Sequence, residues 1–367
     1  MTCPVGPLGT DSGLGLPAGH ARTVPASRDP RVPVGLIVGL LAGVVLVLVF
    51  LRLVDFGDVY GRLEHLDLGL ALLSGVAFLA AYVVRALRWR RLLAPYSVGV
   101  RRVVGIYLVA IFINWLLPLR GGELAKSLLL RHSNGIPVSR SLPTVTMDKA
   151  MDLLPAAALL GLLPFMHLRL SRPLWVLLLF ALGLLVLCVV VLAVAAWRRQ
   201  RVAALLEAGL RVLPGGLGRR VEPFASRFLD SLIALARQPR LLTIAAGYTV
   251  VAVTLDAVFC WLAFLAVGES VALPVVVYGY TFYNLGYLLP TPPGQIGSNE
   301  LVGLLVFSGL FGLSGSAVGA MFVFSHPWTA LLMTAGGLVS LSAMGLSLRG
   351  TLRLSRAPVP ADVREAL

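Results

Sequence analysis

The chain of 367 residues is 58% hydrophobic and only 13% charged, and its mean hydropathy is +0.89. Soluble domains carry charge on roughly 25% of their residues, so this composition excludes an ordinary cytosolic enzyme. The net charge of +14 would indicate nucleic-acid binding in a soluble protein, but here the arginines lie between apolar runs and indicate membrane topology. We therefore predict an all-α polytopic membrane protein with no nucleic-acid partner.

Residues 1–31 are rich in Gly, Pro, Ser and Thr, which predicts a disordered cytoplasmic tail. The apolar run that follows, about 32–54, has spanning length and lacks a cleavage site, so we expect an uncleaved first transmembrane helix. The membrane domain extends to residue 348, and residues 349–367 form a second cytoplasmic tail. Further full spans are predicted near residues 68–87, 142–163, 173–197, 241–267 and 316–346.

Two other apolar regions, 103–131 and 274–311, are interrupted by Pro118 and Pro290 with neighbouring glycines. The first has about sixteen residues before its break, or ~24 Å of helix, which is short of the ~30 Å hydrocarbon core. We predict two re-entrant helical hairpins. Their broken tips are tolerated at membrane depth where they are buried in protein or line a wet cavity.

Arginine is concentrated in four segments: the two tails, residues 85–102, with Arg85 and Arg88 among them, and residues 198–240. Six full spans plus two hairpins place all four segments in the cytoplasm, together with both termini, as the positive-inside rule requires. The segment 198–240 also shows apolar residues at helical spacing, which predicts an amphipathic cytoplasmic linker.

This topology gives residues 68–163 and 241–346 opposite orientations in the membrane. The prediction is an inverted-topology repeat, which is typical of transporters whose broken helices meet near the bilayer midplane and form the binding site.

Several ionisable residues fall at membrane depth, where each costs at least about 2.5 to 3.5 kcal/mol and usually faces a partner, a cavity or a substrate. Lys126 and Lys149 are the two lysines among 31 basic residues, and both fall in this set. Each tip also restarts a helix after glycine, and free amides at a helix N-terminus favour an anion such as a lipid phosphate. The candidate substrate-binding residues are Arg120, Gly121, Gly122, Glu123, Lys126, Asp148, Lys149, Asp152, Gly294, Gly297, Asn299 and Glu300.

Two alternatives stay open for these residues. The charges could pair with one another and only lock the hairpins, and the glycines could only allow close packing. Asp256, in the middle of a predicted span, is a further intramembrane acid.

Three stretches, residues 114–123 with Lys126, 148–152 and 290–300, resemble the lysylphosphatidylglycerol synthase transmembrane region. This flippase-like integral membrane family forms the membrane half of the multiple peptide resistance factor. The resemblance covers about residues 33–348 and departs from the family pattern at both tips. It implies movement of lipids with charged or glycosylated headgroups between leaflets, in the plasma membrane of a bacterium or archaeon.

We therefore expect flipping or scrambling of a phospholipid or polyprenyl lipid, without a cofactor, a metal site or covalent chemistry. The aminoacyl-transferring domain of the synthases is absent from this sequence, so the expectation is that the chain is not an enzyme. One alternative is an integral membrane transferase acting on a polyprenyl-phosphate-linked sugar, with a metal held by Asp55 and Asp58 or by Glu64 and Asp67. Another is a non-transporting subunit of a lipid-modifying complex, whose protein partners would be a second copy or a separate lipid-modifying enzyme.

Overall fold

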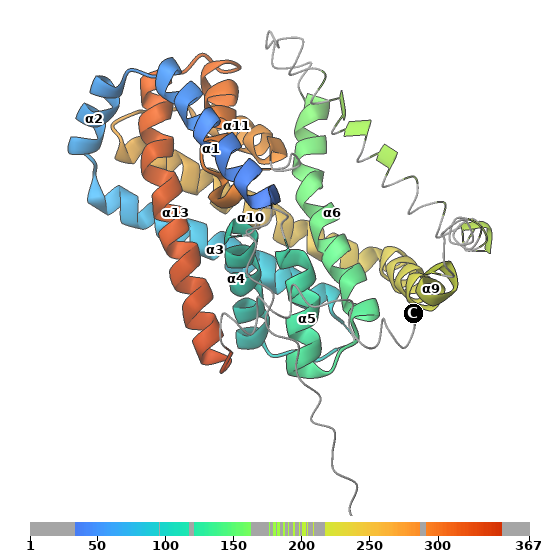
Figure 1. The fold of residues 1–367 in the computed structure, drawn as a ribbon. Coiled ribbons are helices and arrows are strands. Elements are labelled where there is room, and N and C mark those ends of the chain that lie inside the picture. Colours follow the sequence, from blue (N-terminus) through green and yellow to red (C-terminus); the bar gives the residue numbers. More distant parts are fainter. Residues whose placement is uncertain are drawn as a thin grey trace, which may run out of the picture.

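The computed structural model describes residues 34–94, 96–116, 121–162, 217–286 and 291–346, with scattered positions between 176 and 208 (Figure 1). Within these ranges the chain is helical and contains no strand, so the predicted all-α class is confirmed. The predicted tails and most of the span at 173–197 lie outside the described residues.

Three of the described helices are long and apolar enough to cross a membrane: α3 (Leu68–Leu92), α10 (Pro239–Ala266) and α13 (Gly315–Ala343). A fourth candidate is the bent pair of α1 (Val34–Leu53) and α2 (Phe56–Glu64), whose axes meet at 89°. The chain is therefore a polytopic membrane protein, while the numbers of spans and repeats stay predictions.

The helix α6 (Val138–Leu162) falls where a full span is predicted. It has 25 residues, contains Pro143 and Pro155, and carries Asp148, Lys149 and Asp152 within its length. These three charges belong to the central ion network described below.

The two interrupted regions form short helices on either side of a break. The first consists of α4 (Val100–Leu116) and α5 (Gly122–Asn134). The second contains α11 (Leu273–Leu285), the single turn η4 (Pro293–Gln295), α12 (Ser298–Gly303) and the π-helical turn η5 (Leu304–Ser308), in that order. The described helices therefore end before Pro118 and Pro290, which themselves lie outside the described residues, and helices begin again after them.

Close helix packing explains one glycine at the first break. A Cβ added at Gly122 would overlap the backbone carbonyl of Ala110 on α4. The amide of Gly122 donates a hydrogen bond of 2.8 Å to Oδ1 of Asn114, near the end of α4. The short helices α4 and α5 are thus held side by side.

The helices pack in pairs around the centre of the molecule. The helix α3 lies along α10, while α4 packs against α13 and α11 packs against α6 (Figure 1). The amphipathic helix α9 (Leu217–Ala236) packs on α6 and buries Leu235 in a cluster with Met147 and Met151. The first broken region therefore packs against α3 and α13, and the second packs against α10 and α13.

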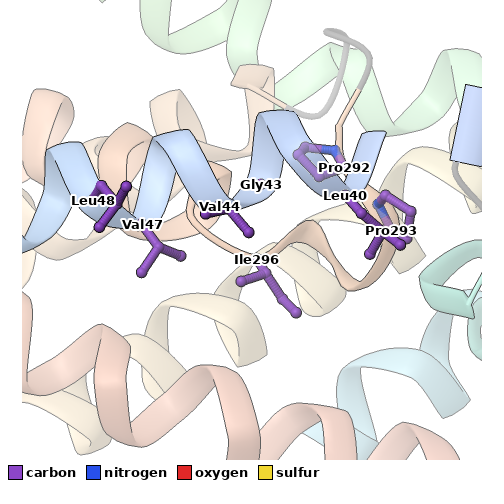
Figure 2. A pocket seen from close by; sticks show the side chains of 8 residues that line it. All are labelled: Leu40, Gly43, Val44, Val47, Leu48, Pro292, Pro293 and Ile296. Atoms are coloured by element: carbon purple, nitrogen blue, oxygen red, sulfur yellow. The ribbon is translucent and has the colours of Figure 1, made fainter. Parts of the chain in front are cut away.

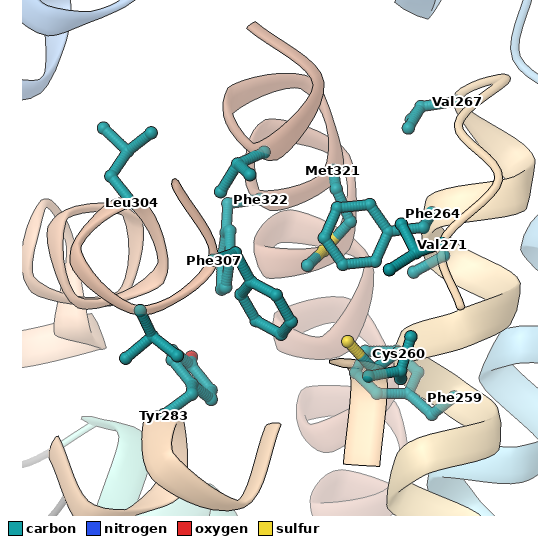
Figure 3. Close-up of a cluster of buried hydrophobic side chains, with 14 of the residues drawn as sticks. Phe259, Cys260, Phe264, Val267, Val271, Tyr283, Leu304, Phe307, Met321 and Phe322 are labelled. Carbon is teal, nitrogen blue, oxygen red and sulfur yellow. The ribbon is translucent and has the colours of Figure 1, made fainter. Parts of the chain in front are cut away.

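An aromatic core holds the second broken region against α10 and α13 (Figure 3). The rings of Phe264 and Phe307 meet edge to face with centroids 5.1 Å apart, and Phe322 packs against Phe307. Cβ atoms at Gly279 or Gly303 would overlap these rings. Glycine therefore allows α11 to approach Phe307 of η5 and α12 to approach Phe322 of α13.

Candidate functional site

A fully buried arginine joins three helices at the centre of the molecule. Arg88 of α3 is 0% exposed and donates to Oδ1 of Asp148 (2.8 Å), to Oδ1 of Asp152 (2.7 Å) and to the backbone carbonyl of Asp148 (2.9 Å). It also donates to the hydroxyl of Thr249 on α10 (2.9 Å). A planar guanidinium with several donors suits such a junction, because it can satisfy several acceptors at once.

Lys126 of α5 lies next to this junction and is 1% exposed. Its ammonium is 3.4 Å from Oδ2 of Asp148 and 3.2 Å from Oε2 of Glu123. It also lies 3.7 Å from the centroid of the Tyr107 ring, a cation–π geometry. The hydroxyl of Tyr107 donates to Asp148 (3.2 Å), so Asp148 is surrounded by donors.

The outer part of the network is more accessible. The side chain of Lys149 is 49% exposed and pairs with Oε1 of Glu123 at 3.1 Å and with Oδ2 of Asp152 at 3.5 Å. Arg85 of α3 pairs with Asp256 of α10 through both guanidinium nitrogens and lies 3.8 Å from Asp152. The network therefore has an inner part closed to solvent and an outer part that a ligand can reach.

A second polar cluster lies at the other tip. Nδ1 of His326 on α13 hydrogen-bonds Glu300 of α12, and Nε2 hydrogen-bonds the carbonyl oxygen of Gly294 at 2.8 Å. Beside them the amide of Asn299 donates to Oε1 of Gln295 (3.2 Å). These contacts tie the second tip to α13.

Both clusters face one cavity of about 530 Å³. The two broken regions meet at its edge, since α4 packs against η4 and the ring of Trp115 lies beside Gly294. Ionisable side chains from five helices line the cavity: Arg85, Arg88, Glu123, Lys126, Lys149, Asp152, Asp256 and His326.

The structure brings five of the predicted site residues into the wall of this cavity: Glu123, Lys126, Lys149, Asp152 and Asn299. Two others lie behind the wall, where Asp148 is fully buried against Arg88 and Glu300 contacts His326. The glycines Gly121, Gly122, Gly294 and Gly297 are not among the lining residues. Arg120 lies outside the described residues.

The glycines at the tips have structural roles that the free-amide hypothesis did not include. The amide of Gly122 donates to Asn114 rather than facing the cavity. A Cβ at Gly297, where φ is +77°, would overlap Leu46 and the backbone of Val47 on α1. The alternative of close packing therefore accounts for Gly122 and Gly297.

The second tip has one apolar side, which faces α1. A small apolar pocket of about 190 Å³ lies between them (Figure 2). It is lined by Leu40, Gly43, Val44, Val47, Leu48, Pro292, Pro293 and Ile296. Gln295 of the same tip lines the charged cavity instead, so the tip separates an apolar surface from a polar one.

Arg85, Arg88, Tyr107 and His326 are among the cavity residues that were not predicted as site residues. The topology assigned Arg85 and Arg88 to a cytoplasmic segment, whereas the structure places both inside α3, which extends to Leu92. Both begin an arginine-rich run that continues with Arg90 and Arg91 and resembles a cytoplasmic loop, so no local signal in the sequence indicates their burial.

The acids proposed for metal binding have a different role here. Oδ1 of Asp55 accepts hydrogen bonds from the amides of Gly57 and Asp58 at the start of α2. Asp67 caps α3 in the same way, through the amide of Leu70. Both are helix N-caps, a position that aspartate favours.

Fold and site together define an integral membrane protein in which broken helices surround a charged cavity. The chain belongs to the family described as the lysylphosphatidylglycerol synthase TM region, which matches residues 36–337. This confirms the resemblance found in the sequence.

The chain is similar to proteins of Haloferax volcanii and Methanothermobacter thermautotrophicus. The chain is 25% identical to the glycosyltransferase AglD of Haloferax volcanii over 92% of its own residues, and it spans 58% of the length of that relative. It is also similar to two UPF0104 membrane proteins of Methanothermobacter thermautotrophicus. The identities are 26%, over 78% of this chain and 86% of the relative, and 23%, over 84% and 95%. No solved structure matches the chain.

Proposed function

We propose that this protein moves a lipid with a charged or glycosylated headgroup between the two leaflets, by flipping or scrambling, while the cavity holds the headgroup. The observation that carries the proposal is one charged cavity bordered by both broken regions. Ionisable residues inside a membrane mark substrate pathways by default. A volume of about 530 Å³ falls within the range of small-molecule sites, about 300 to 1,000 Å³.

The two parts of the ion network suggest two roles. Arg88, Asp148 and Lys126 are closed to solvent and pair with one another, so we assign them to holding the helices. Lys149 is half exposed and its partners are carboxylates with exposed surface. It can exchange these partners for a lipid phosphate, and we assign it to headgroup binding together with Glu123 and Asp152.

The helix packing supports the inverted repeat as part of this proposal. Under the predicted repeat, α3 corresponds to α10, α4 to α11 and α6 to α13. Exchange of the two repeats leaves the α3–α10 pair unchanged and converts the α4–α13 pair into the α11–α6 pair. All three pairs are packed together, as a two-fold relation requires. We propose that the hairpins enter from opposite leaflets and that both termini are cytoplasmic.

A covalent function has one supporting observation, the name glycosyltransferase carried by the Haloferax relative. A transferase that holds a metal at Asp55 and Asp58 would lose activity when these acids are removed, with little change on loss of Lys149. The flippase proposal predicts the opposite ranking. For a non-transporting subunit, these substitutions would instead weaken binding of a protein partner and leave the lipid distribution unchanged.

The decisive test is lipid movement in liposomes. Purified protein should move a headgroup-labelled anionic phospholipid across the bilayer, measured as loss of label accessibility to an added membrane-impermeant quencher. Lys149→Ala should slow this movement roughly tenfold or more, since a hydrogen bond to a charged group contributes about 1.5 to 3 kcal/mol.

The matched control is Arg140→Ala, which removes a cation from an exposed position on the same helix, α6. It should leave the rate unchanged. The proposal is wrong if wild-type protein moves neither a phospholipid nor a polyprenyl lipid, or if Lys149→Ala moves lipid as fast as wild type.

A further inference from the structure

The contacts of His326 restrict where protons can be. A backbone carbonyl only accepts hydrogen bonds, so Nε2, which contacts the Gly294 carbonyl at 2.8 Å, must carry a proton. Nδ1 is hydrogen-bonded to Oε1 of Glu300, and a second proton must lie between these two atoms. The pair is therefore either an imidazolium with a carboxylate or a neutral imidazole with a protonated carboxyl group.

We propose that His326 and Glu300 form a proton-binding site that couples proton uptake and release to movement of the second tip, residues 291–297. This inference rests on the proposed lipid movement and names its energy source as a proton gradient. The bound proton comes from water through the cavity that His326 lines, and it returns to water on release. No other covalent bond is made or broken.

Loss of the shared proton must break one of the two contacts. If Nε2 keeps its proton, the lone pair of Nδ1 faces a carboxylate. If the proton moves to Nδ1, the lone pair of Nε2 faces the carbonyl oxygen of Gly294. Either arrangement places two acceptors together, so the tip or Glu300 must separate from α13.

The surroundings of the pair favour such a movement. His326 directly precedes Pro327 in α13, and a proline inside a helix removes one backbone hydrogen bond and allows bending. The tip has positive φ at Gly294 (+66°), Gln295 (+57°) and Gly297 (+77°). Oε2 of Glu300 is buried without a hydrogen-bond partner. Among the described residues, the hydrogen bond recorded between the tip and α13 is that of Gly294 with His326, while the contacts of the tip with α1 are apolar.

Among the described residues, no other titratable side chain has a recorded hydrogen bond or ion pair with His326 or Glu300. On α12 and η4 the neighbours of His326 are Glu300 and a backbone carbonyl, and Asn299 and Gln295 beside them are uncharged. Among described residues, Glu300 is the ion-pair partner recorded for His326. The remaining charged groups of the cavity come from α3, α5, α6 and α10: Arg85, Arg88, Glu123, Lys126, Lys149, Asp152 and Asp256.

The test measures lipid movement in liposomes with and without an imposed pH difference, and the readout is the ratio of the two rates. For the wild type we expect this ratio to differ from one by roughly two- to tenfold, the effect of one hydrogen bond. Glu300→Gln keeps a hydrogen bond to Nδ1, because an amide can donate there, but it cannot share a proton. This variant and His326→Gln should give a ratio near one.

The control is His132→Gln, which removes an exposed histidine on α5 and should keep the wild-type ratio. The inference is overturned if Glu300→Gln and His326→Gln keep the wild-type ratio, or if the wild type moves lipid with no response to the gradient. If the wild type moves no lipid at all, the proposed function fails and coupling fails with it.

A second measurement does not need lipid movement and remains usable if a variant fails to fold. Nitrogen NMR of wild-type protein labelled at histidine should show one buried ring with both nitrogens protonated or strongly hydrogen-bonded. Its signals should change between about pH 5 and 8, the range in which histidine titrates, together with signals from the tip. Signals that stay constant over this range would overturn the proton site.

Discussion

Charge balance is the main feature of the cavity at the residue scale. The ion network contains four cations and four carboxylates: Arg85, Arg88, Lys126 and Lys149 with Glu123, Asp148, Asp152 and Asp256. An unpaired charge in hydrocarbon is costly, so these groups can exist at membrane depth because each has a partner. A ligand that displaces a carboxylate from one of these cations must supply a negative charge in its place, which favours headgroups that carry a phosphate.

Part of this network could be predicted from the sequence. Asp148, Lys149 and Asp152 lie within one turn of each other, and Lys149 does pair with Asp152 at 3.5 Å, as the spacing predicts. The partners of Arg88 lie 60 or more residues away along the chain. Nothing local in the sequence distinguishes it from the arginines that follow, so its burial depends on how α3, α6 and α10 pack.

Loss of Arg88 should damage the fold more than loss of any exposed arginine. Arg88→Ala leaves Asp148 without its closest cation in a site closed to solvent, and breaking a buried ion pair costs about 3 to 5 kcal/mol. The free energy of unfolding in mixed micelles should fall by that amount. Arg91→Ala, on the exposed surface one turn further along α3, should change it by less than about 0.5 kcal/mol. Equal losses in the two variants would contradict the assigned role of Arg88.

At the scale of elements, the breaks were the most predictable feature. Proline and glycine stop a helix for local reasons, and both interrupted regions are divided where their sequences indicate. The ends of the helices were harder to predict, because α3 continues to Leu92 through arginines that resemble a loop. The contacts of the second tip with α1 and His326 were also hidden, since they join segments far apart in the chain.

The close approach of α4 and α5 gives a prediction for this scale. Gly122→Ala should separate the two helices, because its Cβ would overlap the Ala110 carbonyl, and overpacking costs about 1 to 3 kcal/mol. Both the midpoint of thermal unfolding and lipid movement should fall.

The control for this change is Gly247→Ala in α10, where an added Cβ meets no atom within 4 Å. It should be neutral or stabilise by up to about 1 kcal/mol, the difference in helix propensity. A Gly122→Ala variant as stable as Gly247→Ala would show that the helices are not in tight contact.

For the whole molecule, the account depends on two broken regions that meet at one cavity while facing opposite sides of the membrane. Apolar side chains exposed on α1, α3 and α10 provide the surface that lipid tails would cover. The paired contacts of the two predicted repeats are those that a symmetric arrangement would require. The proposed membrane orientation rests on the arginine distribution, and it is the part of the account that a direct measurement can test.

That measurement is the accessibility of single cysteines to a membrane-impermeant thiol reagent, applied from either side of oriented vesicles. Cys3 and Cys188 would be replaced by alanine, and Cys260 can stay because it is buried. Four exposed positions at or beyond the outer ends of the hairpin arms would then be tested one at a time: Ser97→Cys and Asn134→Cys for the first hairpin, and Ser270→Cys and Ser314→Cys for the second.

The account predicts that positions 97 and 134 react from the cytoplasmic side and that positions 270 and 314 react from the opposite side. If the two positions that flank either hairpin react from different sides, that segment crosses the membrane fully. The proposed arrangement of two half-crossing segments around one headgroup site would then be contradicted.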